Sequence, residues 1–174
     1  IFISQGRRIS AGSTIISCME GTRALLVEIQ ALVARANFGM PERKVSGVDY
    51  NRVSMLLAIL EKRIGLKLGG QDIFVNIVGG VQIDEPAADL GIAMTIASSF
   101  KEKVIPSDIV FVGEVGLGGE VRSVSQIEIR LKEAQRLGFK RAVIPKDNAK
   151  GIGKELGIER IEVCYLSEAV EIIG

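Results

Sequence analysis

The 174-residue chain contains no histidine and no tryptophan. The lack of histidine excludes Ser-His-Asp and Cys-His catalysis, and it excludes metal sites built on imidazole ligands. Two cysteines are present, Cys18 and Cys164, and they lie far apart without a CxxC spacing. Both stand in apolar, strand-like segments, so we expect buried free thiols and no metal site in this chain.

Aromatic residues make up only 5% of the chain, whereas apolar residues make up 47%. The core must therefore consist of Val, Ile, Leu and Ala, as in α/β proteins with small-residue helices. With 22 basic and 21 acidic residues the net charge is +1, which excludes a bulk polycation. Any contact with nucleic acid must come from a local basic patch.

The sequence shows no signal peptide and no membrane span, so we expect a cytoplasmic protein that does not contact a membrane. It starts with Ile1 rather than Met, and we expect a fragment of a longer protein. The length fits one domain. Residues 1–13 are polar and contain glycine, which indicates a linker or the tail of a preceding domain, and residues 14–174 form the domain itself.

The first half of the chain predicts antiparallel strands followed by a helix. Residues 14–19 form a short apolar strand, and residues 25–33 alternate with period two, with Glu28 and Gln30 on the polar side. Residues 37–48 predict a loop. Apolar residues then recur at helical spacing from Val53 to Ile64, and Gly65 ends this helix.

The second half predicts alternating strands and helices, and hence a mixed α/β sheet with helices packed on it. Ser125 and Glu128 have the spacing of a capping box that opens a helix reaching residue 137. The remaining predicted elements are strands at 72–78, 141–144 and 161–165, helices at 86–99, 149–156 and 167–173, and a hairpin of 109–114 with 120–124.

Four long segments carry a resemblance to a known family. They are residues 19–33, 47–63, 84–90 (Asp-Glu-Pro-Ala-Ala-Asp-Leu) and 112–122 (Val-Gly-Glu-Val-Gly-Leu-Gly-Gly-Glu-Val-Arg). They closely resemble the C-terminal domain of the bacterial RadA (Sms) family of DNA-repair proteins, and the match covers nearly the whole chain. That domain is similar to the proteolytic domain of Lon protease, which implies the Lon-like (ribosomal protein S5 domain 2-like) α/β fold.

The resemblance also implies a setting for the domain. Full-length members of the family carry an N-terminal zinc finger and a RecA-like ATPase core, so ATP, Mg²⁺ and Zn²⁺ are expected in the missing N-terminal part and no cofactor in this fragment. Members act as rings, usually hexamers, that promote branch migration and strand extension on recombination intermediates. The implied partners are further copies of the chain, single-stranded or branched DNA, and the recombinase RecA.

Lon-type proteases use a serine nucleophile and a lysine base, and the resemblance places Asp89 and Glu128 at these two positions. A carboxylate cannot replace the alkoxide, so we predict no peptidase activity. The simple structural interpretation is that Asp89 caps a helix and that Glu128 completes a capping box with Ser125.

A sharper alternative is a pair of carboxyl groups at Asp89 and Glu128. If the two carboxylates lie close together, repulsion between their charges raises the pKa of one of them. Such a pair could carry out acid–base catalysis in a hydrolase, or it could hold Mg²⁺. Arg23 or Arg130 beside the pair would neutralise it.

Two further patterns are weaker. Ser98 or Ser99 with Lys101 imitates a serine–lysine dyad, although serines at a helix end are usually caps or surface residues. Residues 151–155 approach a phosphate-binding loop but fail, because Glu155 follows Lys154 where Ser or Thr is required and Asn148 replaces the first glycine. We therefore infer no ATP site in this fragment.

Basic residues gather around the predicted loop and first helix. One interpretation is a solvated face, since Glu42 and Glu61 lie among them. The other is a surface that contacts DNA phosphates without reading sequence, and a ring would multiply its field. The candidate DNA-binding residues are Arg43, Lys44, Arg52, Lys62 and Arg63.

Overall fold

The computed structural model describes residues 2–3 and 10–174. Its strands are β1 (Ser13–Glu20), β2 (Arg23–Arg35), β3 (Arg43–Ser46), β4 (Gln71–Ile77), β5 (Ile109–Phe111), β6 (Glu114–Val115), β7 (Val121–Arg122), β8 (Arg141–Pro145) and β9 (Glu159–Val163). Its α-helices are α1 (Tyr50–Ile59), α2 (Asp89–Lys101), α3 (Ile127–Arg136) and α4 (Leu166–Glu171). A π-helical turn, η1 (Leu60–Ile64), extends α1, and two 3₁₀ segments are η2 (Pro86–Ala88) and η3 (Lys146–Gly151).

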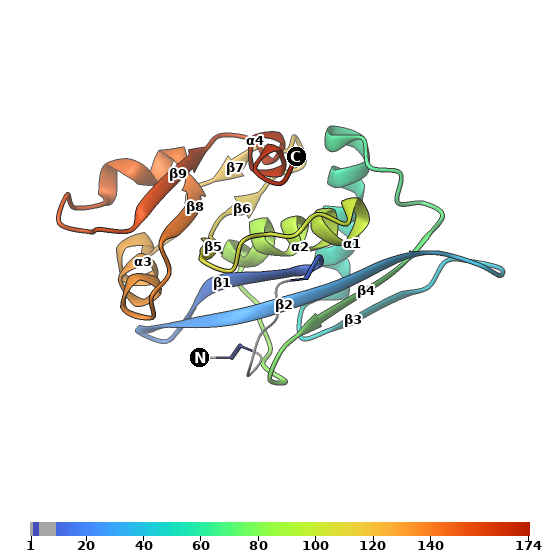
Figure 1. Cartoon of the computed structure of the whole chain (residues 1–174), viewed down its shortest axis with the longest axis horizontal. Helices are drawn as coiled ribbons and strands as arrows, with labels where there is room; N and C mark the ends of the chain where they lie inside the picture. Colours follow the sequence, from blue (N-terminus) through green and yellow to red (C-terminus); the bar gives the residue numbers. More distant parts are fainter. Residues whose placement is uncertain (1, 4–9) are drawn as a thin grey trace.

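In the described part of the chain, seven strands form one sheet in the order β3-β4-β2-β1-β5-β8-β9, and β6 pairs with β7 alone. Strand β2 runs antiparallel to β1 and to β4, and the other neighbouring strands of the large sheet are parallel. The predicted mixed α/β class is therefore confirmed, with antiparallel strands early in the chain and parallel ones later (Figure 1).

Helices cover both faces of the sheet. One face carries α1, α2 and α4, and the central part of the other face carries α3 (Figure 1). This arrangement explains why the predicted half-buried strand is wrong for part of β2: Glu28, expected on a polar face, is 1% exposed. It lies on the same side of β2 as the fully buried Leu26, and it accepts a hydrogen bond of 2.7 Å from the Ser13 hydroxyl.

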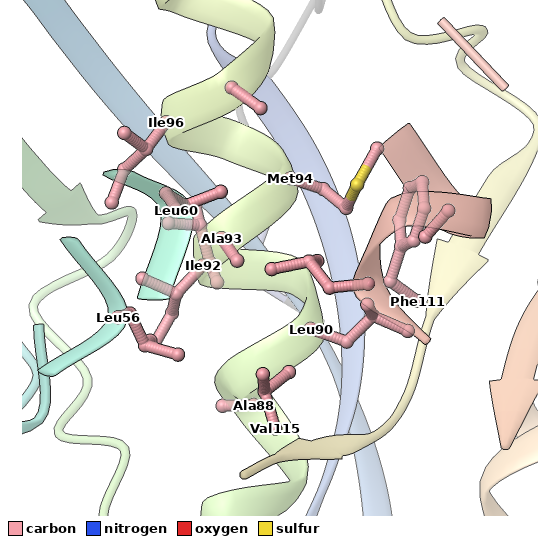
Figure 2. Packing of buried hydrophobic residues seen from close by; sticks show 14 of the residues in the cluster. Leu56, Leu60, Ala88, Leu90, Ile92, Ala93, Met94, Ile96, Phe111 and Val115 are labelled. Carbon is pink, nitrogen blue, oxygen red and sulfur yellow. The ribbon is translucent and has the colours of Figure 1, made fainter. Parts of the chain in front are cut away.

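Helix α2 lies at the centre of the larger core. Every residue from Asp89 to Ser99 is buried. Figure 2 shows Ile92 on the side of Leu56 and Leu60, whereas Met94 lies on the side of Phe111 from β5. The small residues of this helix let it approach the sheet closely, and apolar contacts of this kind supply most of the stability of such a domain.

Some predicted elements are wrong in type or position. The predicted loop 37–48 contains the edge strand β3, and the predicted helix 149–156 is instead the 3₁₀ segment η3 followed by irregular chain. The predicted hairpin is split, because β5 joins the large sheet and only β6 and β7 pair with each other. Short segments of this kind depend on the strand that lies beside them more than on their own propensity.

The linker predicted over residues 1–13 falls mostly outside the described residues. Phe2 is described, and its backbone exchanges two hydrogen bonds of 2.8 Å with Leu26 and Glu28 at the side of β2. Strand β1 begins at Ser13. The boundary between a linker and a domain at residue 14 stays a prediction.

Candidate functional site

The turn at Asp84 and Glu85, which we call the acidic turn, and the start of α2 form the first candidate site. The chain enters α2 through the 3₁₀ segment η2, where Pro86 occupies the first helical turn. Backbone hydrogen bonds of 3.0 Å link Leu90 N to Gly113 O and Gly113 N to Ala87 O. The helix start is thereby fixed against the segment that leads from β5 to β6, and Asp89 is held at this junction.

Asp89 forms a buried ion pair with Arg52. The Arg52 Nε donates to Asp89 Oδ1 at 2.8 Å, and Arg52 Nη2 donates to Oδ2. The backbone N–H of Val115 also donates to Oδ2, at 3.0 Å. The Asp89 side chain is 1% exposed and that of Arg52 is 28% exposed. Asp89 thus binds a side chain of α1 and the backbone of β6.

Burial raises the pKa of Asp89, and the hydrogen bonds from Arg52 and Val115 oppose this only in part. The hydrogen bond to Asp89 raises the pKa of Arg52. The predicted cap is wrong in its partner: Asp89 begins α2, but no side chain caps this helix, and the carboxylate accepts from β6 and α1 instead.

A small cavity of about 140 Å³ opens beside this pair. Four carboxyl-bearing side chains are among its lining, and three of them have partners elsewhere: Asp89 pairs with Arg52, Glu85 pairs with Arg130, and Asp49 caps α1. Among the residues that the structure describes, no serine or lysine lines the cavity. In the part of the chain that the structure describes, no group of three or more His, Cys, Asp or Glu residues is arranged to hold a metal ion.

Glu128 lies in a different environment from Asp89. Its Oε1 accepts a hydrogen bond of 3.4 Å from the backbone N–H of Gly153. The predicted capping box with Ser125 is wrong, because the residue before α3 is Gln126, in a left-handed conformation and without a side-chain cap. Asp89 and Glu128 bind separate partners, and Glu128 is not among the groups that shift the pKa of Asp89, so no observation supports the predicted carboxyl pair.

Arg130 also differs from its predicted role. It is 1% exposed and pairs with Glu85, with Nη1–Oε1 and Nη2–Oε2 distances of 2.5 Å and 3.0 Å. Its other hydrogen bonds go to the backbone carbonyls of Ser125 and Ser17. Arg130 thus ties α3 to β1 and to the acidic turn. Arg23, the other expected neutralising residue, is exposed and lies at the start of β2.

The serine–lysine pattern of α2 does not form a dyad. The prediction for Ser98 and Ser99 was caps or surface residues; both are buried, so a surface position is wrong. The Ser98 hydroxyl accepts from Gly12 N and donates to Lys103 O, and the Ser99 hydroxyl accepts from Val33 N at 2.9 Å. Lys101 Nζ donates to the carbonyl of Gly174. These serines join α2 to neighbouring backbone, which is a packing role.

The five predicted DNA-binding residues have different environments. Arg52 forms an ion pair with Asp89, and the Arg43 guanidinium donates hydrogen bonds to the backbone carbonyls of Gln71 and Leu68. Lys44 is 71% exposed, with Glu42 at 4.0 Å. Two of the five therefore hold the fold together, and they are poor candidates for phosphate contacts.

Lys62 and Arg63 remain exposed on η1, and neither forms an ion pair with any residue that the structure describes. Arg63 uses only its Nε, which donates to Leu117 O at 3.3 Å. Lys67 follows two residues after Gly65 and is also exposed. The sequence analysis did not select Lys67. Its position could have pointed to it, because Lys67 lies just after the predicted helix end at Gly65 and close to Lys62 and Arg63. We call Lys62, Arg63 and Lys67 the basic cluster.

The cysteines differ from each other. Cys18 is buried as predicted, and burial together with the nearby Glu85 raises the pKa of its thiol to about 12. Cys164 is only partly buried, so its prediction is wrong in part; both thiols are free. Among the described residues, the structure contains no helix long and apolar enough to cross a membrane.

Comparison with known proteins places the chain in a family. A family model described as subunit ChlI of Mg-chelatase matches residues 29–148, which is more than half of the chain. The chain belongs to this family. The matched range runs from the middle of β2 to η3, and so contains α1, η1, α2 and α3 together with the Arg52–Asp89 pair.

Named relatives match the chain from end to end. DNA repair protein RadA of Bacillus subtilis is 53% identical over 170 residues, or 98% of this chain and 37% of the relative. RadA of Listeria monocytogenes is 50% identical over 98% of this chain and 37% of the relative, and RadA of Synechocystis sp. is 42% identical over 99% of this chain and 34% of the relative. The chain is a RadA-related domain that spans little more than a third of these relatives.

Proposed function

We propose that this chain is the non-proteolytic, Lon-like part of a DNA-repair protein, in which it joins copies into a ring and contacts DNA. The name shared by relatives at 42–53% identity supports the repair role. The observation that carries the proposal is the buried Arg52–Asp89 ion pair, which occupies the helix start where the resemblance to Lon places a serine nucleophile.

Two features of the structure and one chemical requirement support the absence of proteolysis. Asp89 is bound on both oxygens and has no nucleophilic hydroxyl. Glu128 has its own backbone partner, the N–H of Gly153. Peptide hydrolysis by a serine–lysine pair needs an alkoxide and a neutral lysine at one point. We expect the purified chain to leave casein and fluorogenic peptides intact; hydrolysis that co-purifies with the chain and disappears in Asp89→Asn would contradict this.

The basic cluster supports contact with DNA phosphates. It lies at the C-terminal end of the α1–η1 helix, where unpaired carbonyl groups favour cations, and Gly65 ends the turn with φ +84°. Cations that form no ion pair with the described residues are free to replace the counterions of DNA, which gives salt-dependent binding without sequence preference. Lys44, which is exposed on β3, is a further candidate.

The test is a charge reversal with a matched control. We expect Lys62→Glu/Arg63→Glu to weaken binding of single-stranded and branched DNA, and to reduce the salt slope of the binding constant by about one for each cation removed. The control is Lys150→Glu/Lys154→Glu, two exposed lysines near η3 at the other side of the sheet. Equal loss of binding in both variants would mean that only overall charge matters, and the basic cluster would have no specific role.

Ring assembly is tested by solution mass. We expect light scattering after size exclusion to give a closed assembly of about six chains, since the resemblance implies a hexamer and closed rings are stable end states of head-to-tail contacts. A monomer at every concentration would overturn assembly by this domain. In the longer protein, the proposed zinc finger and ATPase would supply the Zn²⁺, ATP and Mg²⁺ sites, and RecA is the proposed protein partner.

A further inference from the structure

The short turn between β6 and β7 places one apolar side chain in solvent. The turn consists of residues 116–119, Gly-Leu-Gly-Gly, so Leu117 is its only side chain. Leu117 is 66% exposed, although Val115 and Val121 on either side of the turn are buried. These two valines anchor the turn in the larger core, and the turn carries Leu117 out of that core.

Hydrogen bonds within the turn fix its shape. Gly119 N donates to Gly116 O, and Gly116 N donates to Glu120 O, both at 2.9 Å. Gly118 N donates to Glu120 Oε1 at 3.0 Å. Gly119 has a φ of +80°, which glycine adopts without strain. Leu117 is therefore held outward on an ordered turn, and little further ordering of the backbone is needed when it binds a partner.

The turn also contacts the basic cluster. Arg63 Nε donates to Leu117 O at 3.3 Å, and a Cβ atom at Gly119 would lie 3.3 Å from Cβ of Arg63. Arg63 is exposed, and its two Nη groups form no hydrogen bond or ion pair with the residues that the structure describes. An exposed leucine thus lies beside an arginine whose outer N–H groups are available to a ligand.

The carboxylates around the turn are engaged within the chain or lie away from its tip. Glu61 and Glu120 accept hydrogen bonds of 3.1 Å and 3.0 Å from backbone N–H groups. Glu168 accepts from two backbone N–H groups at the start of α4. Glu114 is half-buried in β6, and Glu171 ends α4, whose first residue hydrogen-bonds to the turn. The cations of the basic cluster have no ion-pair partners among the described residues, so they are the charges most available to a ligand beside the turn.

We infer that Leu117 inserts between the bases of bound DNA while the basic cluster holds the adjacent phosphates. Proteins that kink or open DNA insert apolar side chains, leucine among them, between base steps, and they use Arg and Lys beside these wedges. Leu117 and Arg63 provide both groups in direct contact. This inference rests on the DNA contact proposed above and names the side chain that reads the form of the DNA. Unstacking costs least where bases are already unpaired, so the wedge favours branched DNA over uniform duplex.

The kind of partner follows from how little apolar surface the turn offers. A stable protein interface buries roughly 800 Å² on each partner around an apolar centre. The turn presents one apolar side chain, which is too little for such a centre but sufficient for a wedge between bases. Tyr165 is 54% exposed and forms a backbone bridge with Glu120 at the foot of the turn, so this surface also contains an aromatic ring of the kind on which bases stack.

Fluorescence of a base analogue tests the wedge directly. Aminopurine emits weakly when it is stacked in DNA and more strongly when it is unstacked, and we place it at the branch point of a forked oligonucleotide. We expect its emission to rise when the chain binds. Leu117→Ser should abolish this rise and weaken binding of forked DNA about tenfold, as for one leucine that is no longer buried. The salt slope should stay unchanged, because the phosphate contacts remain.

Two matched variants complete the test. Leu117→Met keeps an apolar side chain and should keep the rise in emission, and Leu32→Ser, at a leucine of β2 that is 59% exposed, should also keep it. If Leu117→Ser gives the full rise, the wedge is wrong while the proposed DNA contact stands. If Leu117→Ser lowers the solution mass but not the emission, Leu117 belongs to a contact between copies and the inference is overturned. An unaltered chain that binds no DNA overturns both proposals.

Discussion

Asp89 is a buried carboxylate whose charge is matched by one arginine and one backbone N–H. Removing a charge from water costs several kcal/mol, and only a close partner offsets this cost. The position that the family resemblance links to nucleophilic catalysis thus holds a carboxylate whose two oxygens both accept hydrogen bonds. In this structure, Asp89 connects α1, α2 and β6.

The ion pair should behave as a unit in stability measurements. We expect Arg52→Met to lower the free energy of unfolding by about 3–5 kcal/mol, because Asp89 is left buried without a countercharge. The double variant Arg52→Met/Asp89→Leu should recover most of this loss, since apolar residues of similar size replace the pair. Urea denaturation measures all three chains. A double variant as unstable as the single one would show that the charge of the pair is not the cause.

The raised pKa of Asp89 predicts a pH dependence with a definite sign. The folded state binds the Asp89 proton more tightly than the unfolded state, where the pKa is close to 3.8. The contribution of this group to the free energy of unfolding is therefore constant below that value, and it falls as the pH rises toward the folded pKa. We expect the difference in stability between the unaltered chain and Asp89→Asn to decrease with rising pH across this interval. A difference that increases would contradict the direction of the shift.

At the scale of single elements, α2 depends on the absence of a side chain at Gly91. A Cβ atom there would lie 2.1 Å from Cγ2 of Ile16, so the helix touches β1 at this point. At the same point, the Thr14 hydroxyl donates a hydrogen bond of 3.2 Å to Gly91 O. The small residues of α2 are therefore required by packing against the sheet.

Gly91→Ala should be destabilising even though alanine favours helix. Overpacking in a closed core costs about 1–3 kcal/mol, which exceeds the gain in helix propensity of about 1 kcal/mol. The control is Gly70→Ala, because a Cβ at Gly70 meets nothing within 4 Å. Thermal unfolding compares the two variants. Equal melting temperatures for both would show that Ile16 moves aside at little cost.

At the scale of the whole molecule, the two sides of the sheet are joined by Arg130. This side chain reaches from α3 to Ser17 in β1 and to Glu85 in the acidic turn, beside the start of α2. The chain thereby connects its smaller core under α3 with the larger core around α2. Because this buried arginine has partners in three parts of the fold, the loss of one partner weakens its hydrogen bonds to the others.

Arg130→Met should loosen α3 before the rest of the fold. We expect backbone amides of α3 to exchange with solvent faster than those of α2, because α3 loses its polar link to β1 while α2 keeps its apolar contacts. Arg136→Met provides the comparison, since Arg136 forms an exposed pair with Glu133 at the end of the same helix and such pairs contribute little. Exchange that increases equally in α2 and α3 would indicate that the two cores open together.

The sequence alone determined the mixed α/β class and the absence of imidazole-based chemistry. Period-two and helical spacing predicted most of the strands and helices, because each buries its own apolar face, and the lack of histidine excluded imidazole catalysis without any structure. The family resemblance predicted that Asp89 stands where Lon-type proteases have their serine nucleophile. These properties depend on the local pattern or on composition, which the linear sequence contains.

Only the tertiary structure decided which charges are buried and which are free. Arg52 and Lys62 belong to the same predicted basic group, yet one binds Asp89 thirty-seven positions away and the other has no ion-pair partner among the described residues. Glu28 looks polar and exposed in sequence but lies under the side of the sheet that α3 covers. The exposed Phe38 and Met40 likewise lie within a segment that the sequence predicted only as a loop. Burial and pairing depend on elements brought together by the sheet order, and no local pattern records that order.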